Sequence, residues 1–197
     1  MIDVEQITEE IVHREGGFVN DPDDLGGATS WGVTLKTLQG IRGSATIEDI
    51  KNLTQDEAEE IYIEHYYKKT KISKLPEPLQ ATVYDMQVNA GRNAIKILQT
   101  VANQFGTNLK ADGYLGSKSI AAINEIYFDT KSHLVDAYSI ARRDYYFKLG
   151  DNRSQSRKYC VTRRGKKGGW IKRAEEFISS KYHMTQKDFD KRIAKWA

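Results

Sequence analysis

The chain has 197 residues, of which 39% are hydrophobic and 29% are charged, and its formal net charge is +3. This length allows one substantial core or two small lobes, and the composition excludes a disordered or low-complexity protein. The single cysteine, Cys160, excludes an internal disulfide, and we interpret it as an incidental thiol.

The net charge hides an asymmetry along the chain. Residues 1–130 hold 12 Lys/Arg and 20 Asp/Glu, a net charge of −8, whereas residues 131–197 hold 18 and 7, a net charge of +11. The acidic part and the basic part are therefore expected to have different functions. The N-terminus lacks the basic and apolar regions of a signal peptide, and no apolar run reaches the roughly 20 residues of a membrane span. We expect synthesis in the cytoplasm.

The first expected element is an amphipathic helix over residues 3–14, because Val4, Ile7 and Ile11 recur at helical spacing. Residues 15–33 are dense in glycine and contain a proline, which excludes a regular helix there. We expect a long irregular segment, with short strands or a small hairpin only within residues 15–35. Long loops in compact domains are usually functional.

Helical patterns return after this segment. Thr54 and Glu57 form a capping box, Ser117 is expected to cap a helix, and Thr185 with Asp188 is expected to start the last one. No run of strands alternates with helices, so the predicted fold is all-α with at most a short β-hairpin. The expected helices cover residues 54–69, 76–90, 91–105, 117–127, 130–149, 169–183 and 185–196, and residues 150–168 are expected to form a loop.

The irregular segment is also rich in carboxylates, which include Glu15, Asp21 and Asp24. Hydrolysis of a glycosidic bond needs a proton donor for the leaving oxygen and a second group that activates water or stabilises the transition state. The donor must sit where its neutral form is favoured, and the end of an apolar-faced helix is such a place. The alternative interpretation of Glu15 is the solvated last residue of a helix that ends at a glycine.

The twenty residues from Glu15 to Thr34, EGGFVNDPDDLGGATSWGVT, resemble the signature of glycoside hydrolase family 108. These muramidases occur as phage endolysins and as secretion-associated lysozymes, and their pattern is roughly E-G-G-Y-x-N-x-P-x-D-x-G-G-x-T-x-x-G-I-T. Two positions depart from it: Phe18 replaces the tyrosine and Val33 replaces the isoleucine. Phe18 keeps the ring but removes the hydroxyl.

The resemblance implies a lysozyme-like fold and cleavage of the β-1,4 bond between N-acetylmuramic acid and N-acetylglucosamine in peptidoglycan. The resemblance also implies that Glu15 is the catalytic general acid. Asp24 and Thr29 are then the candidates for stabilising the charge of the transition state and for positioning the attacking water. Asp21 competes with Asp24, and either aspartate could instead cap a turn. We expect Asn20, Asp21 and Trp31 to contact substrate, although Trp31 could equally belong to the core.

A second stretch, from Tyr84 to Gly91, resembles the family's motif D-x-x-V-N-x-G. This resemblance would place Asp85, Gln87 and Asn89 on a helix that faces the substrate. The alternative for Asp85 and Asn89 is helix capping and hydrogen bonding within the core, and we weigh the two equally.

From residue 91 the chain resembles the peptidoglycan-binding region that follows in this family, with D-G-x-x-G at residues 112–116 and G-W-x-x-R at residues 169–173. We expect a catalytic region over residues 1–90 and a helical binding region over residues 91–197, packed as one compact unit. The basic insert at residues 151–168 departs from the family's shorter connection. It is interpreted either as a contact with anionic envelope polymers or as a solvated loop.

The expected partner is bacterial peptidoglycan, reached in the periplasm or cell wall through a holin or a secretion system. Nucleic acid is a minor alternative, because arginine and tyrosine interleave near the insert but no nucleic-acid motif is present. The four histidines lack ligand spacing, so we expect no metal site. We also expect no cofactor and a monomer. The rival function is a non-catalytic peptidoglycan-binding protein with a degenerate site.

Overall fold

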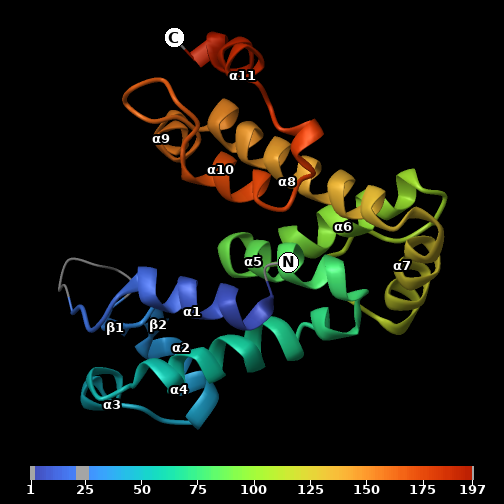
Figure 1. Cartoon of the computed structure of the whole chain (residues 1–197). Coiled ribbons are helices and arrows are strands. Elements are labelled where there is room, and N and C mark those ends of the chain that lie inside the picture. Colours follow the sequence, from blue (N-terminus) through green and yellow to red (C-terminus); the bar gives the residue numbers. More distant parts are fainter. Residues whose placement is uncertain (1–2, 21–26, 197) are drawn as a thin grey trace. The chain divides into compact units, whose positions relative to one another are not determined.

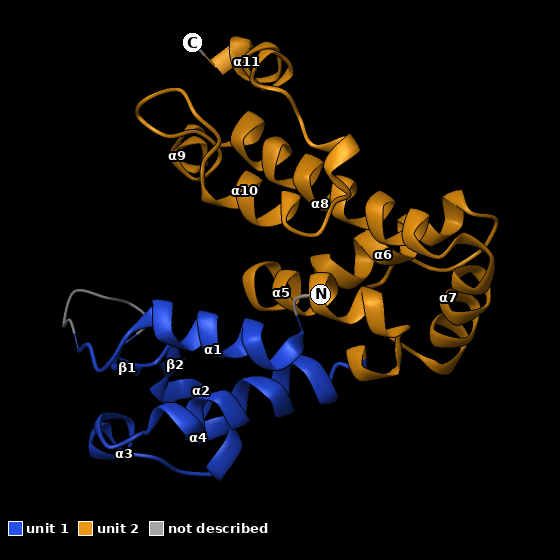
Figure 2. Ribbon diagram, in the orientation of Figure 1, with its two compact units in different colours: residues 1–71 blue, residues 72–197 orange. Residues whose placement is uncertain are grey.

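A computed structural model describes residues 3–20 and 27–196. The chain divides into two compact units, Met1–Lys71 and Ile72–Ala197, each described here by itself (Figure 2). The described part is mainly helical, and its one sheet has two short strands. The predicted all-α class with a small hairpin is therefore confirmed.

The first unit is built around helix α1, Val4–Glu15, which packs against helix α4, Gln55–Tyr62 (Figure 1). An Asp3–Gln6 capping box starts α1, and its buried face carries Ile7 and Val12. The remaining elements are β1 (Thr29–Ser30), β2 (Val33–Thr34), α2 (Leu35–Arg42), α3 (Ile47–Lys51) and η1, a π-helical turn that continues α4 over Ile63–Lys68.

The second unit is organised by its longest helix, α8 (Ser132–Asn152), which packs against α5 (Glu77–Ala90), α6 (Asn93–Gln104) and α10 (Gly169–Glu175). The other helices are α7 (Ser117–Thr130), α9 (Arg157–Cys160) and α11 (Gln186–Ile193). Short helical turns lie at η2 (Ile72–Lys74), η3 (Ser154–Ser156), η4 (Ser180–Tyr182) and η5 (Ala194–Trp196).

A hydrophobic cluster closes the far end of α8. Its buried members are Tyr146, Phe147, Cys160, Ile171, Ala174 and Phe189. Cys160 lies in this core, where its thiol donates to the carbonyl of Tyr146 over 3.3 Å. Burial raises the pKa of the Cys160 thiol to about 11, so the thiolate is scarce at neutral pH.

Most predicted helices are present, with four corrections. Helix α7 begins after Gly116, and Ser117 is its first residue rather than its cap. Residues 150–168 are not only a loop, because α8 extends to Asn152 and α9 follows. The expected helix over 169–183 ends at Glu175, and α2 and α3 were not expected from the sequence pattern.

Candidate active site

Helix α1 ends at Glu15 because a glycine follows it. Gly16 has a φ of +74°, in the left-handed region that favours glycine, and its N–H donates to the carbonyl of Val12 over 3.3 Å. The carbonyl of Gly16 accepts the N–H of Trp31 over 2.7 Å. The end of the helix is therefore joined directly to the hairpin.

The hairpin is short and tightly turned. Strand β1 pairs with β2 through Thr29 with Thr34 and Ser30 with Val33. The two loop residues, Trp31 and Gly32, have φ values of +53° and +75°, as a type I′ turn requires. On its other side Thr29 exchanges two backbone hydrogen bonds of 2.8 Å with Val19, so this residue is fixed from both directions.

Gly32 brings the hairpin into contact with Glu15 and with α4. A Cβ atom added at Gly32 would lie 2.4 Å from the Tyr62 hydroxyl oxygen and 2.9 Å from Glu15 Cγ. Both side chains therefore pack on the bare backbone of Gly32. Tyr62 is buried and stacks on Tyr66, with ring centroids 5.2 Å apart. Sequence reasoning missed Tyr62, because nothing in the pattern of α4 separates it from an ordinary core tyrosine.

Glu15 is exposed, although it continues the stripe of α1 that buries Val4, Thr8 and Ile11. Glu15 is not covered by other side chains, because the residues beside it are glycines. These are Gly32 and the two residues that follow Glu15. The partly desolvated position expected for this carboxylate is therefore not observed. The glycines instead leave open space around the Glu15 carboxylate, while its side chain lies on Gly32. A bulky substrate can therefore approach this carboxylate closely.

Trp31 is partly buried, and both of its N–H groups are engaged. The indole Nε1–H donates to the carbonyl of Leu53 over 3.0 Å, and the backbone N–H donates to Gly16. These bonds tie the turn to the end of α1 and to the segment before α4. They give Trp31 a structural role, and contact between its ring and substrate stays a prediction.

Of the other predicted site residues of the first unit, two lie in the described part of the chain and two do not. Thr29 is partly buried in β1, and Asn20 is exposed just after the residue that pairs with Thr29. Asp21 and Asp24 lie outside the described residues. The second catalytic group therefore stays a prediction, and within the described part the structure brings together Glu15, Gly32 and Tyr62, with Thr29 and Trp31 on the same hairpin.

The three residues predicted on α5 belong to the second unit. Asp85 is buried and accepts hydrogen bonds from Arg142 and, over 2.9 Å, from Nε of Arg173. Gln87 is buried, and its Oε1 has no partner among the described residues, whereas Asn89 is exposed. The ion pairs of Asp85 favour the alternative role within the core. Substrate contact by these residues stays a prediction.

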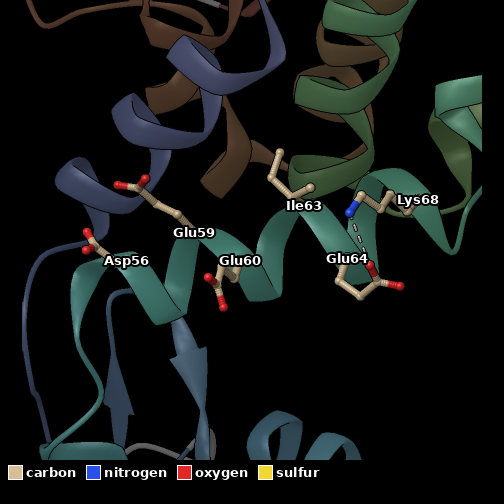
Figure 3. Close-up of a pocket in the computed structure, with 6 residues that line it drawn as sticks. All are labelled: Asp56, Glu59, Glu60, Ile63, Glu64 and Lys68. Atoms are coloured by element: carbon tan, nitrogen blue, oxygen red, sulfur yellow. Dashed lines mark ion pairs between the residues drawn. The ribbon is translucent and has the colours of Figure 1, made fainter.

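A hollow of about 570 Å³ follows one side of α4 and η1 (Figure 3). It is negatively charged, because four of its lining side chains are carboxylates and only one is a lysine, which pairs with Glu64 over 3.6 Å. None of the predicted site residues lines it. The lining residues are Asp56, Glu59, Glu60, Ile63, Glu64 and Lys68.

Across residues 3–20 and 27–196, no three His, Cys, Asp or Glu side chains gather as metal ligands. The same part of the chain contains no helix with the length and apolar character needed to cross a membrane.

Comparison with known proteins connects these features to two families. Residues 8–91 match the family described as Glycosyl hydrolase 108, and residues 93–175 match the family described as Predicted Peptidoglycan domain. A search of curated proteins gave no match. Among solved structures, SagA from Brucella abortus is similar over 87% of this chain and 94% of its own, with 27% sequence identity and a TM-score of 0.57.

The first match contains the end of α1 with Glu15, the hairpin and α4, which are the parts of the first unit that meet at Gly32. The second contains α6 to α10. The two matches follow one another along the chain, and together they agree with the resemblance carried by the Glu15–Thr34 signature. Residues 8–91 are therefore similar to glycosyl hydrolase 108, a likeness that supports lysozyme-like hydrolysis of peptidoglycan, and the residues that follow them are similar to a peptidoglycan domain.

Proposed function

We propose that the protein is an N-acetylmuramidase that hydrolyses the β-1,4 bond between N-acetylmuramic acid and N-acetylglucosamine, with Glu15 as the general acid. The observation that carries this proposal is the placement of Glu15, whose side chain rests on Gly32 at the junction of α1, the hairpin and α4. A general acid has to be held within hydrogen-bond reach of the leaving oxygen. Contact with Gly32 in a tight turn, on which the buried Tyr62 also packs, supports such positioning.

In this mechanism Glu15 donates its proton to the glycosidic oxygen as the bond to the anomeric carbon breaks. The developing oxocarbenium-like charge needs a second group that stabilises it or orients the attacking water. Asp24 and Thr29 are our candidates, and Asp21 is the alternative to Asp24. Thr29 has the rigidity that this role demands, because both of its backbone hydrogen bonds to Val19 measure 2.8 Å.

Replacement of Glu15 by glutamine tests the assignment. Because glutamine keeps the shape but cannot donate the proton, we expect release of reducing ends from purified sacculi to fall by about 10²- to 10⁴-fold, with unchanged circular dichroism. Glu9→Gln is the matched control, since Glu9 is also exposed on α1 and is expected to leave activity intact. Wild-type rates in the Glu15 variant would show that another residue is the acid.

Analysis of the products separates the proposal from its rivals. Hydrolysis leaves reducing N-acetylmuramic acid ends, whereas a transglycosylase leaves anhydro ends that mass spectrometry distinguishes. A wild-type protein that binds sacculi but releases no fragments would instead be a binding protein with a degenerate site. The cellular context that we propose is an endolysin or a wall-remodelling enzyme, acting as a monomer after passage through a holin or a secretion system.

A further inference from the structure

The connection between α9 and α10, drawn as a loop in Figure 1, is closed into a small hairpin by backbone hydrogen bonds. Val161 pairs with Lys167, and the N–H of Thr162 donates to the carbonyl of Lys166 over 2.8 Å. The N–H of Gly165 returns to the carbonyl of Thr162 over 2.9 Å, and Gly165 has a φ of +70°. This is a type I turn closed by a left-handed glycine. Its two central positions are residues 163 and 164.

The base of this hairpin is anchored in the second unit. The ammonium group of Lys167 bonds to the buried carboxylate of Glu175 and to the carbonyl of Met184. The N–H of Gly168 donates to the carbonyl of Cys160 over 2.7 Å, and a Cβ added at Gly168 would lie 2.5 Å from the carbonyl oxygen of Tyr159. The tip is therefore presented from a fixed base, which lowers the entropy lost when a ligand binds.

The tip itself carries three exposed cations, Arg163, Arg164 and Lys166. Among the residues that the structure describes, none of the three has a carboxylate within ion-pair distance. In contrast, Lys167 and Arg173 nearby are both engaged by acidic groups of the core. The charge of the tip is thus directed to solvent, and two adjacent guanidinium groups are well suited to bind carboxylates through paired hydrogen bonds.

An aromatic stack reaches the surface beside the hairpin. Tyr146 stacks on Trp170 with centroids 5.0 Å apart, and Trp170 stacks on Tyr159 at 4.7 Å, with interplanar angles of 24° and 26°. Tyr159 ends the stack and is 45% exposed. Lys158 holds its ammonium 5.0 Å from the Tyr159 ring. A rigid ring supported from below is a surface on which the apolar face of a sugar can stack.

We propose that Tyr159 together with Arg163, Arg164 and Lys166 forms a binding site for peptidoglycan. The ring takes a sugar of the glycan strand, and the cations take the carboxylates of the stem peptides. Both features lie within the residues that match the peptidoglycan domain, which favours the carboxylates of that polymer over other anions. This inference rests on peptidoglycan being the substrate of the proposed muramidase, but it assigns a contact separate from Glu15.

The test is co-sedimentation with purified sacculi at low ionic strength, in which every full chain compared carries Glu15→Gln so that binding is measured without bond cleavage. We expect Arg163→Gln/Arg164→Gln to weaken binding by about tenfold or more, as loss of charge-assisted hydrogen bonds predicts. Tyr159→Ala should also weaken binding, whereas Tyr159→Phe should retain it because the ring remains. Lys118→Gln/Lys148→Gln is the matched control, since it removes two exposed charges elsewhere in the same unit.

Two treatments of the sacculi identify the anion. Hydrofluoric acid removes phosphodiester-linked polymers, and binding should survive it. Subsequent amidation of the carboxyl groups should abolish the difference between the wild type and the arginine variant. Loss of binding on hydrofluoric acid treatment alone, equal weakening by the control pair, or tighter binding to a single-stranded oligonucleotide than to sacculus fragments would each overturn the proposal.

Failure of this site is distinguishable from failure of the proposed function. Release of reducing ends from the same sacculi reports catalysis by Glu15, and sedimentation reports binding by the hairpin. A chain that binds through the hairpin without releasing reducing ends would reject the muramidase and keep the site. Release of reducing ends with unaltered binding by the arginine variant would reject the site and keep the muramidase.

Discussion

At the level of single residues, Gly32 controls where the side chain of Glu15 can lie. Gly32→Ala would place a methyl group within 2.9 Å of Glu15 Cγ and closer still to the Tyr62 hydroxyl. Displacement of a catalytic group by about 1 Å can cost 10²-fold in rate. We therefore expect sacculus hydrolysis to fall by about 10- to 100-fold, with a loss of about 1–3 kcal/mol in unfolding free energy from the positive φ.

Gly43→Ala separates the loss of stability caused by the positive φ from the loss of activity caused by displacing Glu15. Gly43 has a φ of +82°, similar to that of Gly32, but nothing lies within 4 Å of an added Cβ. It should lose comparable stability while keeping its activity, as measured by denaturant unfolding and by reducing-end release. If the two variants keep equal activity, the contact with Gly32 does not position Glu15.

The candidate site was predictable from the sequence only in part. The glycines and carboxylates after α1 indicated a functional segment, and the signature singled out Glu15 within it. The roles of Gly32 and Tyr62 depend on a contact between the hairpin and α4, which no local pattern reports. Asp85 shows the same limit, since its partners Arg142 and Arg173 lie 57 and 88 residues further along the chain.

At the level of elements, one carboxylate joins α11 and η5 to the end of α8, in addition to the burial of Phe189 in the hydrophobic cluster. Asp151, near the end of α8, accepts hydrogen bonds from Arg192 at 2.8 Å, from Lys195 at 2.9 Å and from the indole of Trp196 at 2.7 Å. The Arg192 bonds contribute most, and together these partners hold the pKa of Asp151 far below its ordinary value of 3.8.

Because the folded pKa is lowered, this stabilisation is present above the ordinary value and is lost as the pH falls below it. Asp151→Asn should cost about 1–2 kcal/mol of unfolding free energy at pH 6, a figure reduced for the partial exposure of the side chain. The variant should also lose less stability than the wild type between pH 5 and 2. Urea unfolding measures both, and Asp129→Asn on α7 serves as the exposed control.

Element boundaries were predictable where a local cap sets them. The Thr54–Glu57 box begins α4, the hydroxyl of Thr185 accepts the N–H of Asp188 at the start of α11, and Gly16 ends α1. Element boundaries that are set by hydrogen bonds to distant parts of the chain were not predictable. The chain leaves α10 early because Glu175 accepts the N–H of Met184 and because Ser179 donates twice to Asp136, 43 residues away. Helices α2 and α3 escaped prediction because each is short and buries one apolar side chain.

At the level of the whole molecule, the charge divides with the two units. Residues 1–71 hold 7 Lys/Arg and 15 Asp/Glu, a net charge of −8, and residues 72–197 hold 23 and 12, a net charge of +11. An anionic wall therefore attracts the second unit and repels the first. Long-range attraction of this kind is screened by salt over about 8 Å at physiological ionic strength.

The charge division predicts how hydrolysis responds to salt. Raising the ionic strength should increase KM for intact sacculi severalfold while kcat stays nearly constant, because screening weakens capture but does not alter the contacts of Glu15. Steady-state release of reducing ends at several salt concentrations measures both constants, with amidated sacculi as the control that should show a flatter response. A fall in kcat at constant KM would contradict this assignment of roles.

The cluster at the end of α8 also affects how the protein is made. Phe189, which is fully buried, and Trp196, whose ring occupies the space above Gly150, can complete this cluster only after both residues have left the ribosome. The internal contacts of the first unit involve residues up to 71 only. At about 5–20 residues per second, the internal contacts of the first unit can form roughly 6–25 s before the second unit can close its core. During synthesis, the unit that bears Glu15 is therefore complete well before the unit that carries the basic hairpin.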